Sequence, residues 1–209
     1  MFETMRTAMI DRQLRTTGVN DPAVLTALRA VERERFVPAA RRSLAYTDAA
    51  IELAPGRWLM EPMSFALLLN HAAVLPTDRV LVVGAGTGYG ASVLLQLTAQ
   101  VIALEEDTAL AAAARANGLT VVEGPLVDGW AAGAPYDLIV CDGAVAIVPP
   151  ALLAQLTDGG RLAAVIVGDD GVGRATVGRY AAGHFAGTAF IEAGVQLLPG
   201  FARAPHFVF

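Results

Sequence analysis

The sequence predicts a doubly wound α/β fold, with a mostly parallel sheet and a helical extension at the N-terminus. Three observations support this class. Between residues 80 and 167 apolar runs alternate with helix-forming stretches, the runs are apolar on both faces, and the first third of the chain carries helical patterns instead. Strands buried on both faces and separated by helices are typical of a parallel sheet covered on both sides.

The N-terminal extension is expected to contain two helices. The first covers roughly residues 2–16 and ends at Gly18. The second begins at Asp21, an N-cap residue followed by a proline at the first helical position. Its apolar positions recur at helical spacing until Phe36-Val37-Pro38 ends the run: Val24, Leu25, Leu28 and Val31.

A turn at Pro55-Gly56 and a buried helix over residues 63–75 are expected before the first strand. In the tail, the runs 188–192 and 206–209 suggest a terminal pair of strands. The strands of the core are expected at residues 80–83, 101–104, 119–122, 138–141 and 162–167, and the helices between them at 91–97, 108–116 and 150–156.

Composition limits the partners of this protein. Apolar residues make up 55% and charged residues 17% of the chain, a balance that favours a compact folded protein. The net charge of −5 and the pI near 5.1 argue against a nucleic-acid-binding surface. The local excess of basic residues alternates with Glu32 and Glu34 and therefore indicates a solvated helix face: Arg33, Arg35, Arg41 and Arg42.

The sequence also gives expectations about membranes, redox state and metals. No apolar stretch is long enough to span a bilayer, so no membrane partner is expected. Cys141 permits no internal disulfide, fits a reducing cytoplasm, and is expected to be buried in a strand. The histidines lie near no other residue at metal-ligand spacing, so no metal site is expected: His71, His184 and His206.

The strongest motif is VLVVGAGTGYGASVL at residues 80–94, a strand that runs into a glycine loop and then into a helix. Ligands of parallel sheets bind beyond the carboxyl ends of the strands, where backbone N–H groups are free. A dinucleotide fingerprint needs its third glycine at position 89, which is Tyr89 here. The G-x-G-x-G form is typical of S-adenosylmethionine sites, and a purely structural turn is the alternative. The candidate ligands in the loop are Gly84, Ala85, Gly86, Gly88 and Tyr89.

Three acids complete the candidate cofactor site. Glu105 ends the second strand about 20 residues beyond the loop, where a carboxylate accepts hydrogen bonds from ribose hydroxyls. Glu106 is a second candidate, although an interaction with the dipole of the next helix suits Glu106 and Asp107 better than Glu105. Asp142 follows the fourth strand and faces cofactor or substrate, or caps a loop.

The order of these motifs resembles the protein-L-isoaspartate O-methyltransferase family. MIDRQLRTTGVNDPAVLTALRAVERERFVP is similar to the family's N-terminal helices, LAYTDAAIEL to its entry into the substrate segment, and YDLIVCDGAVAIVPPALLAQLTDGGRL to its fourth strand and following helix. The resemblance covers roughly residues 9–167. It implies a Rossmann-like sheet of the class I methyltransferase type, with a helical and substrate segment at 1–75 and an S-adenosylmethionine-binding core at 76–209 in one compact unit.

The resemblance also implies an activity and a partner. The family transfers a methyl group from S-adenosylmethionine to the side-chain carboxylate of isoaspartyl residues in damaged proteins, so the implied partner is a protein or peptide that carries isoaspartate. A carboxylate, with a reference pKa of about 4, is ionised at neutral pH and needs no general base. In-line methyl transfer then depends mainly on positioning. The chain itself is expected to be a monomer or a small homo-oligomer.

The substrate segment departs from the family pattern G-x-G-Q-T-I-S-x-P. Alignment on Gly56 and Pro62 places Arg57 at the glutamine, Trp58 at the threonine and Met60 at the serine. Because two hydroxyl donors are lost and bulk is added, we expect a pocket that accepts a more apolar group or has closed. Arg57 either binds a carboxylate through two parallel N–H bonds or is a surface arginine beside a turn.

Two further departures concern the cofactor. Val82 stands where the family has a glutamate before the glycine loop, and Pro125 stands where it has an aspartate near the adenine. Both changes are expected to weaken cofactor binding. Three alternatives therefore stay open: a divergent relative with another substrate, a non-catalytic binding module and, disfavoured by Tyr89, a nicotinamide-dependent oxidoreductase. The sequence does not identify a catalytic residue.

Overall fold

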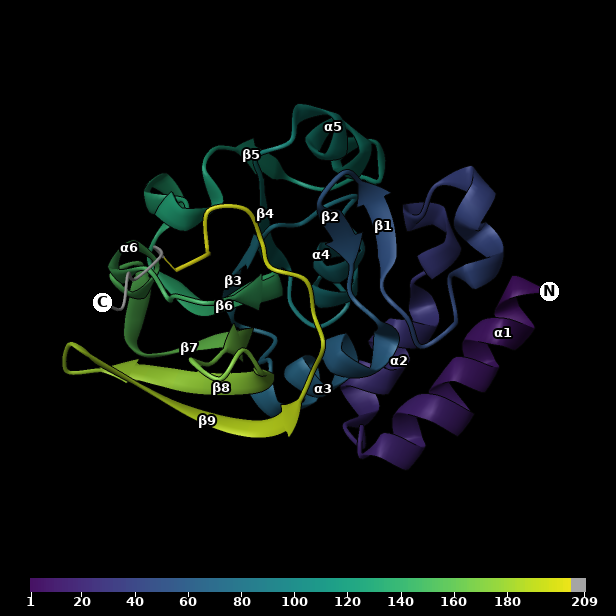
Figure 1. Cartoon of the computed structure of the whole chain (residues 1–209), viewed down its shortest axis with the longest axis horizontal. Helices are drawn as coiled ribbons and strands as arrows, with labels where there is room; N and C mark the ends of the chain where they lie inside the picture. Colours follow the sequence, from purple (N-terminus) through teal and green to yellow (C-terminus); the bar gives the residue numbers. More distant parts are fainter. Residues whose placement is uncertain (204–209) are drawn as a thin grey trace.

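A seven-stranded sheet forms the centre of the protein in the computed structural model, which describes residues 1–203 (Figure 1). The strand order is β5-β4-β3-β6-β7-β8-β9; the strands from β5 to β7 are parallel and the last two are antiparallel. This arrangement confirms the predicted fold class. The strands are β3 (Arg79–Val83), β4 (Gln100–Glu105), β5 (Val121–Glu123), β6 (Tyr136–Val145), β7 (Leu156–Val167), β8 (Gly173–Ala181) and β9 (His184–Glu192).

Both faces of the sheet are buried, as the continuous apolar runs predict. In β3, Val80 and Val82 belong to one hydrophobic cluster and Leu81 and Val83 to another, and all four are fully buried. Successive side chains of a strand point to opposite faces, so the two clusters are the two sides of the sheet. The strand's sequence therefore predicts its central position.

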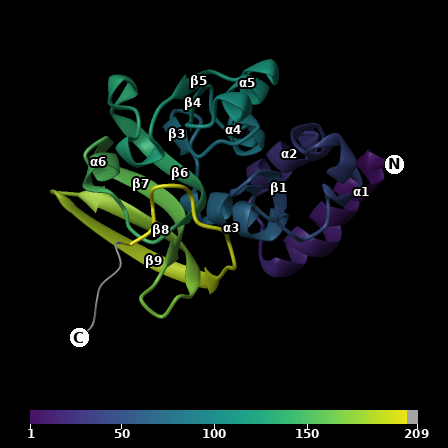
Figure 2. The ribbon, with the colours of Figure 1, turned by 45° about the horizontal axis from the view of Figure 1, so that its top comes forward.

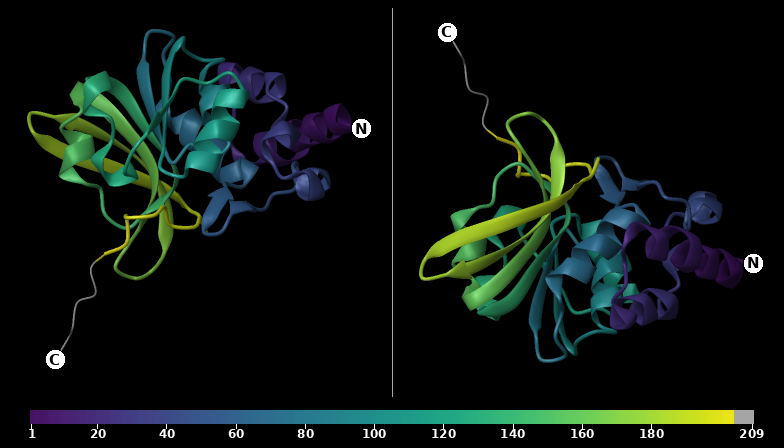
Figure 3. Two further views of the ribbon diagram at one scale, coloured as in Figure 1. Left: turned by 90° about the horizontal axis from the view of Figure 1, so that it is seen from above. Right: turned by 90° about the horizontal axis from the view of Figure 1, so that it is seen from below.

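Helices cover the sheet from the side of the larger cluster (Figure 3). α3 (Pro62–Ala72) packs on β7 and β8, α4 (Tyr89–Leu94) on β3 and β4, and α5 (Thr108–Ala116) on β4 and β5. α5 has the predicted bounds and begins at Asp107, whose side chain accepts hydrogen bonds from Ala109 N and Leu110 N. α6 (Pro150–Leu153) is shorter than predicted, contacts β7 and lies on the other side of the sheet, where its Leu152 belongs to the second cluster.

The N-terminal extension lies at one end of the molecule, beyond α3 (Figures 1 and 2). α1 (Phe2–Met9) continues as a wider π turn and a tighter 3-10 turn until Gly18, whose φ of 101° ends the helix as predicted. α2 (Pro22–Ala30) begins at its predicted N-cap, Asp21. It ends before the predicted Phe36 because residues 33–36 form a separate 3-10 turn.

The prediction of a solvated helix face for the basic cluster is wrong for Arg33. Its side chain is fully buried and donates to Ala45 O (2.7 Å) and Met60 O (2.5 Å). Its guanidinium lies 4.7 Å from the centroid of the Tyr89 ring. Arg33 thus supplies donors to two buried carbonyls of the 1–75 segment, and its contact with Tyr89 joins this segment to the core.

The predicted turn at Pro55-Gly56 joins β1 (Ile51–Ala54) and β2 (Arg57–Leu59) into an antiparallel hairpin. Gly56 adopts a φ of 73°, which favours glycine at this position. Arg57, directly after the turn, is buried; the alternative of a surface arginine is therefore wrong. The hairpin brings Arg57 to the end of β4.

The tail differs from the predicted pair of strands. Residues 188–192 belong to β9 as expected, but its partner is β8, which the sequence analysis missed; residues 206–209 lie outside the described residues. After β9, a segment that we call the returning segment (residues 193–203) runs back across the end of β6 (Figures 1 and 2). Its backbone is bonded to β6 and the adjoining Ala146 by Ala144 N–Gln196 O, Leu198 N–Ala144 O and Ala146 N–Phe201 O.

Candidate functional site

The glycine loop and Glu105 meet at the carboxyl edge of the sheet, as predicted. β3 and β4 are parallel neighbours, so the loop after β3 lies beside the end of β4. Gly86 N donates to Glu105 Oε2 at 2.7 Å. The carboxylate is fully buried. The two features that predict a nucleoside site are therefore in direct contact.

The amides of the loop are largely bonded within the protein. Gly84 N and Ala85 N donate to Leu104 O at 3.0 and 3.1 Å, and Gly88 N donates to Ala85 O at 2.8 Å. Together with the bond from Gly86, these contacts leave few N–H groups of the loop free for a ligand. The backbone of the loop thus has a structural role, whatever else it binds.

Arg57 forms a two-pronged ion pair with Glu105. Its Nη2 donates to Oε2 at 2.7 Å and its Nη1 donates to Oε1. The Arg57 side chain is 6% exposed and the Glu105 side chain 0%. Arg57 thus forms two parallel N–H bonds to a carboxylate, but this carboxylate belongs to the same chain, and the binding of a substrate carboxylate stays a prediction.

The other two acids after β4 have different surroundings. Glu106 is exposed, and its backbone N donates to Glu105 Oε1 at 2.9 Å. Asp107 N donates to the same oxygen at 3.0 Å, while the Asp107 side chain caps α5. Asp107 therefore interacts with the start of the next helix, as the alternative to a cofactor role predicts. Glu105 alone of the three directs a carboxylate into the site.

The sequence analysis missed Leu198, a residue of the returning segment. Its side chain lies on the bare main chain of Gly84 and Gly143: a Cβ at either position would come within 2.6 or 2.7 Å of it. Leu198 is 6% exposed. Because Leu198 is distant in sequence from the glycine loop, the loop motif does not predict this contact. The one sequence feature that agrees with it is that both covered positions, 84 and 143, are glycines.

Little space remains between the hairpin and the returning segment. The cavity there measures about 10 Å³, which is room for about one water molecule. A hollow of about 520 Å³ lies elsewhere, along α2, and none of the predicted site residues lines it. The small cavity is lined by Gly56, Arg57, Trp58, Met60, Asp142, Gly143 and residues 195–198.

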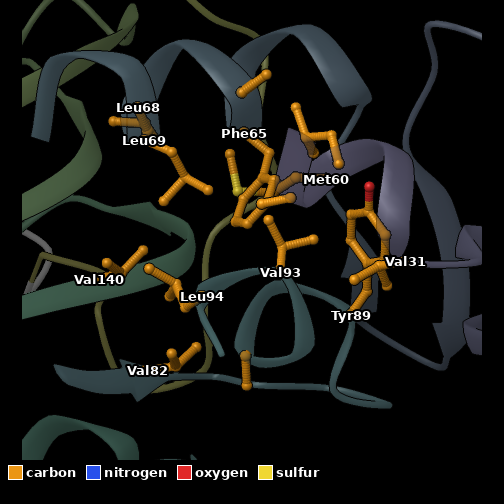
Figure 4. Close-up of a cluster of buried hydrophobic side chains, with 14 of the residues drawn as sticks. Val31, Met60, Phe65, Leu68, Leu69, Val82, Tyr89, Val93, Leu94 and Val140 are labelled. Carbon is orange, nitrogen blue, oxygen red and sulfur yellow. The ribbon is translucent and has the colours of Figure 1, made fainter. Parts of the chain in front are cut away.

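Two substituted positions belong to the hydrophobic core. Met60 is 2% exposed and its side chain lies beside Phe65 (Figure 4). Val82 is fully buried in the same cluster, on the side of Leu94 and Val140 (Figure 4). Trp58, between buried neighbours on β2, is half-buried and lines the small cavity. The apolar replacements therefore extend the core toward the site.

A buried polar cluster lies beneath the site. Tyr89 is 1% exposed, packs edge-on against Phe36, and has no hydrogen-bond partner for its hydroxyl among the described residues. Asp142 is buried in β6, and within residues 1–203 its Oδ1 also has no partner. Burial raises the pKa of Asp142 to about 7, although Arg33 and Arg57 oppose the shift.

The remaining candidates have plain surroundings. Pro125 is exposed and precedes a 3-10 turn. Cys141 is buried in β6 as predicted, and burial raises the pKa of its thiol to about 12. Across residues 1–203, no three His, Cys, Asp or Glu side chains are grouped to hold a metal. Over the same residues, every helix is too short or too polar to cross a bilayer.

Relatives of the chain share most of its length. A Methylorubrum extorquens protein named protein-L-isoaspartate O-methyltransferase is 45% identical over 163 residues, which are 75% of this chain and 72% of that protein. A protein of the same name from Koribacter versatilis is 40% identical over 168 residues, 77% and 76% of the two chains.

Solved structures share the fold. A protein-L-isoaspartate O-methyltransferase superposes with a TM-score of 0.80 at 22% identity, over 96% of this chain and 66% of that one. A Plasmodium falciparum protein, described as a putative protein-L-isoaspartate O-methyltransferase, was solved in complex with S-adenosyl-L-homocysteine. It superposes with a TM-score of 0.77 at 17% identity, over 93% of this chain and 96% of that one. The family model described as protein-L-isoaspartate(D-aspartate) O-methyltransferase matches residues 4–178, and the chain belongs to this family.

Proposed function

We propose that this protein transfers a methyl group from S-adenosylmethionine to the side-chain carboxylate of isoaspartyl residues in proteins or peptides. The observation that carries the proposal is the contact between Gly86 N and Glu105 Oε2 at 2.7 Å. It joins the loop after β3 to the acid at the end of β4, which is the arrangement of a nucleoside site in a parallel sheet. The family's activity supplies the reaction.

We assign the cofactor to the 76–209 core, where Glu105 and the loop backbone are its main candidate partners. Glu106 and Asp142 are further candidates at the same edge, and Tyr89 and Ala85 support the loop from within the core. The 1–75 segment supplies the substrate side through Trp58 and Arg57. Met60 supports that side from the core.

In the arrangement described here, these residues do not accommodate the cofactor. The carboxylate of Glu105 accepts from Arg57 and from three backbone amides, and a cavity of about 10 Å³ is far smaller than an adenosyl group. The donors and acceptors suit a nucleoside, but the space does not. Binding therefore requires a rearrangement of the hairpin and the returning segment.

Three narrower proposals accompany this function. We propose a cytoplasmic location, which the single buried thiol of Cys141 supports. We propose that the protein works as a monomer or a small homo-oligomer. Its partner is a protein or peptide rather than a nucleic acid, as the net charge of −5 favours.

Methyl transfer is tested with a peptide that contains one isoaspartyl residue and with methyl-labelled S-adenosylmethionine. A matched peptide with ordinary aspartate at that position is the control. We expect a base-labile methyl ester on the isoaspartyl peptide only. Equal labelling of both peptides would refute the proposal. So would the absence of labelling by the wild-type protein at saturating cofactor.

A further inference from the structure

Glu105 has no capacity left for a ribose. A carboxylate offers about four lone-pair positions to hydrogen-bond donors. Its Oε2 accepts from Arg57 Nη2 and Gly86 N, and its Oε1 accepts from Arg57 Nη1, Glu106 N and Asp107 N. Two hydroxyls can reach this carboxylate only after Arg57 leaves, because the backbone amides are fixed by the sheet and by α5.

The contact that must break is strong. Bonds between a guanidinium and a carboxylate are about twice as strong as bonds between neutral groups, and neutral hydroxyls would replace them here. The Arg57 side chain is also nearly buried, at 6% exposed, so it must reach water or another anion once it is displaced. Release of Glu105 therefore implies movement of the β1–β2 hairpin that carries Arg57.

A second residue blocks the neighbouring part of the same edge. Leu198 rests on the main chain of Gly84 and Gly143, where the approach is so close that neither position has room for a Cβ. The returning segment is held there by Leu198 N–Ala144 O at 2.8 Å and Ala144 N–Gln196 O at 2.9 Å. A ligand that touches the bare backbone at Gly84 must first lift this leucine.

The remaining volume agrees with the contacts. Sites for small ligands and cofactors occupy about 300–1,000 Å³. The cavity between Arg57 and Leu198 measures about 10 Å³. Two segments that are far apart in sequence, residues 51–59 and 195–198, thus fill one position from opposite sides.

We infer that Arg57 and Leu198 form an autoinhibitory closure of the cofactor position, and that the cofactor binds only to a minor open form. The inference rests on the proposed function for the identity of the ligand. When only a fraction of the protein is competent to bind, the apparent dissociation constant rises in inverse proportion to that fraction. Removal of the side chain of Arg57 or Leu198 therefore raises the affinity for the cofactor, although both side chains lie at the cofactor site.

The test measures binding of S-adenosyl-L-homocysteine by titration calorimetry to wild type, Arg57→Ala and Leu198→Ala. The matched controls are Arg115→Ala, which removes an exposed pair with Glu123, and Leu75→Ala, which removes an exposed leucine that does not line the small cavity. We expect each closing variant to bind at least tenfold more tightly than wild type, and each control to bind as wild type does. Equal or weaker binding by both closing variants, or no binding by any protein, would overturn the inference.

Hydrogen exchange on the protein without ligand gives a second readout. Faster exchange of the Ala144 amide in both closing variants than in the controls is expected, because its bond to Gln196 O holds the returning segment in the closed position. Unchanged exchange would count against it. If Arg57→Ala does not fold, the binding and the hydrogen-exchange measurements are made on Leu198→Ala alone.

The outcomes separate this inference from the proposed function. Tighter binding by the closing variants without methyl transfer would support the closure and refute the activity. Methyl transfer by wild type, with binding that neither substitution changes, would refute the closure and support the activity.

Discussion

Arg57 and Glu105 join two distant parts of the chain, the β1–β2 hairpin and the end of β4, through two nitrogen–oxygen contacts in an almost fully buried pair. The two strands of the hairpin contain seven residues, and this pair connects them to the end of β4. Its energetics are therefore measurable by substitution.

Arg57→Ala is expected to lower the free energy of unfolding by about 3 kcal/mol, because it leaves a buried carboxylate without its cation. Adding Glu105→Gln should recover part of the loss, since the remaining partner is then neutral. Urea denaturation of the wild type, both single variants and the double variant measures the coupling. Additive losses would show that the pair does not act as a unit.

Asp142 is expected to make stability depend on pH. Its pKa is about 7 in the folded protein and near 3.8 in the unfolded chain; burial raises it, Arg33 and Arg57 oppose the shift, and Glu105 adds to it. Between these values the folded state holds one proton more than the unfolded state, so stability falls as pH rises from about 4 to about 7 and then levels off.

Asp142→Asn removes this dependence. From pH 5 to pH 8 the free energy of unfolding of wild type should fall relative to that of the variant by about 3 kcal/mol. Urea denaturation of both proteins at both pH values gives the comparison, in which all other titrating groups cancel. A constant difference would place the Asp142 carboxyl outside this titration range.

Gly84→Ala tests the close approach of Leu198. The position has a φ of 78°, and a new Cβ would lie 2.6 Å from the leucine. Gly118→Ala is the matched control, because its φ is 85° and nothing lies within 4 Å. The control should cost about 1 kcal/mol from the backbone alone, and Gly84→Ala at least twice as much.

Leu198→Ala in the Gly84→Ala background should restore part of the difference. Thermal denaturation of the wild type, the three single variants and the double variant would measure it. If Gly84→Ala and Gly118→Ala cost the same, Leu198 is not seated on the loop.

Arg33→Leu is expected to destabilise the protein by about 3 kcal/mol, because Ala45 O and Met60 O lose their buried donor. Arg35→Leu is the control: the residue is two positions away, but its side chain is 62% exposed and it makes only a long contact with Glu32. Chemical denaturation should show a change below about 0.5 kcal/mol for the control. Similar effects of the two substitutions would contradict the role of Arg33.

The sequence predicted the parts of the fold that local patterns determine. The runs of β3, β4 and β6 are apolar and buried on both faces. Such runs predict strands in the middle of a covered sheet, which is where these three strands lie. The N-cap at Asp21 and the turn at Gly56 depend on residues next to them and were also predicted correctly. β8 was missed because Gly178 interrupts its alternation of apolar and polar residues.

The candidate site was predictable only in its local components. Glu105 and the glycine loop were found because a parallel sheet places neighbouring strand ends together. The partner of Glu105 was not found, because 48 residues separate Arg57 from it and no pattern in the sequence encodes that pairing. Leu198 is still farther from Gly84, and the burial of Arg33 depends on carbonyls from two other segments.

The self-contained bonding of the glycine loop has a consequence for biosynthesis. Gly84, Ala85 and Gly86 are already satisfied by Leu104 and Glu105, so the newly made chain needs no small molecule as a template for this turn. The polypeptide is expected to reach its native state equally well whether S-adenosylmethionine is scarce or plentiful. Its abundance should then be independent of the methyl-donor supply.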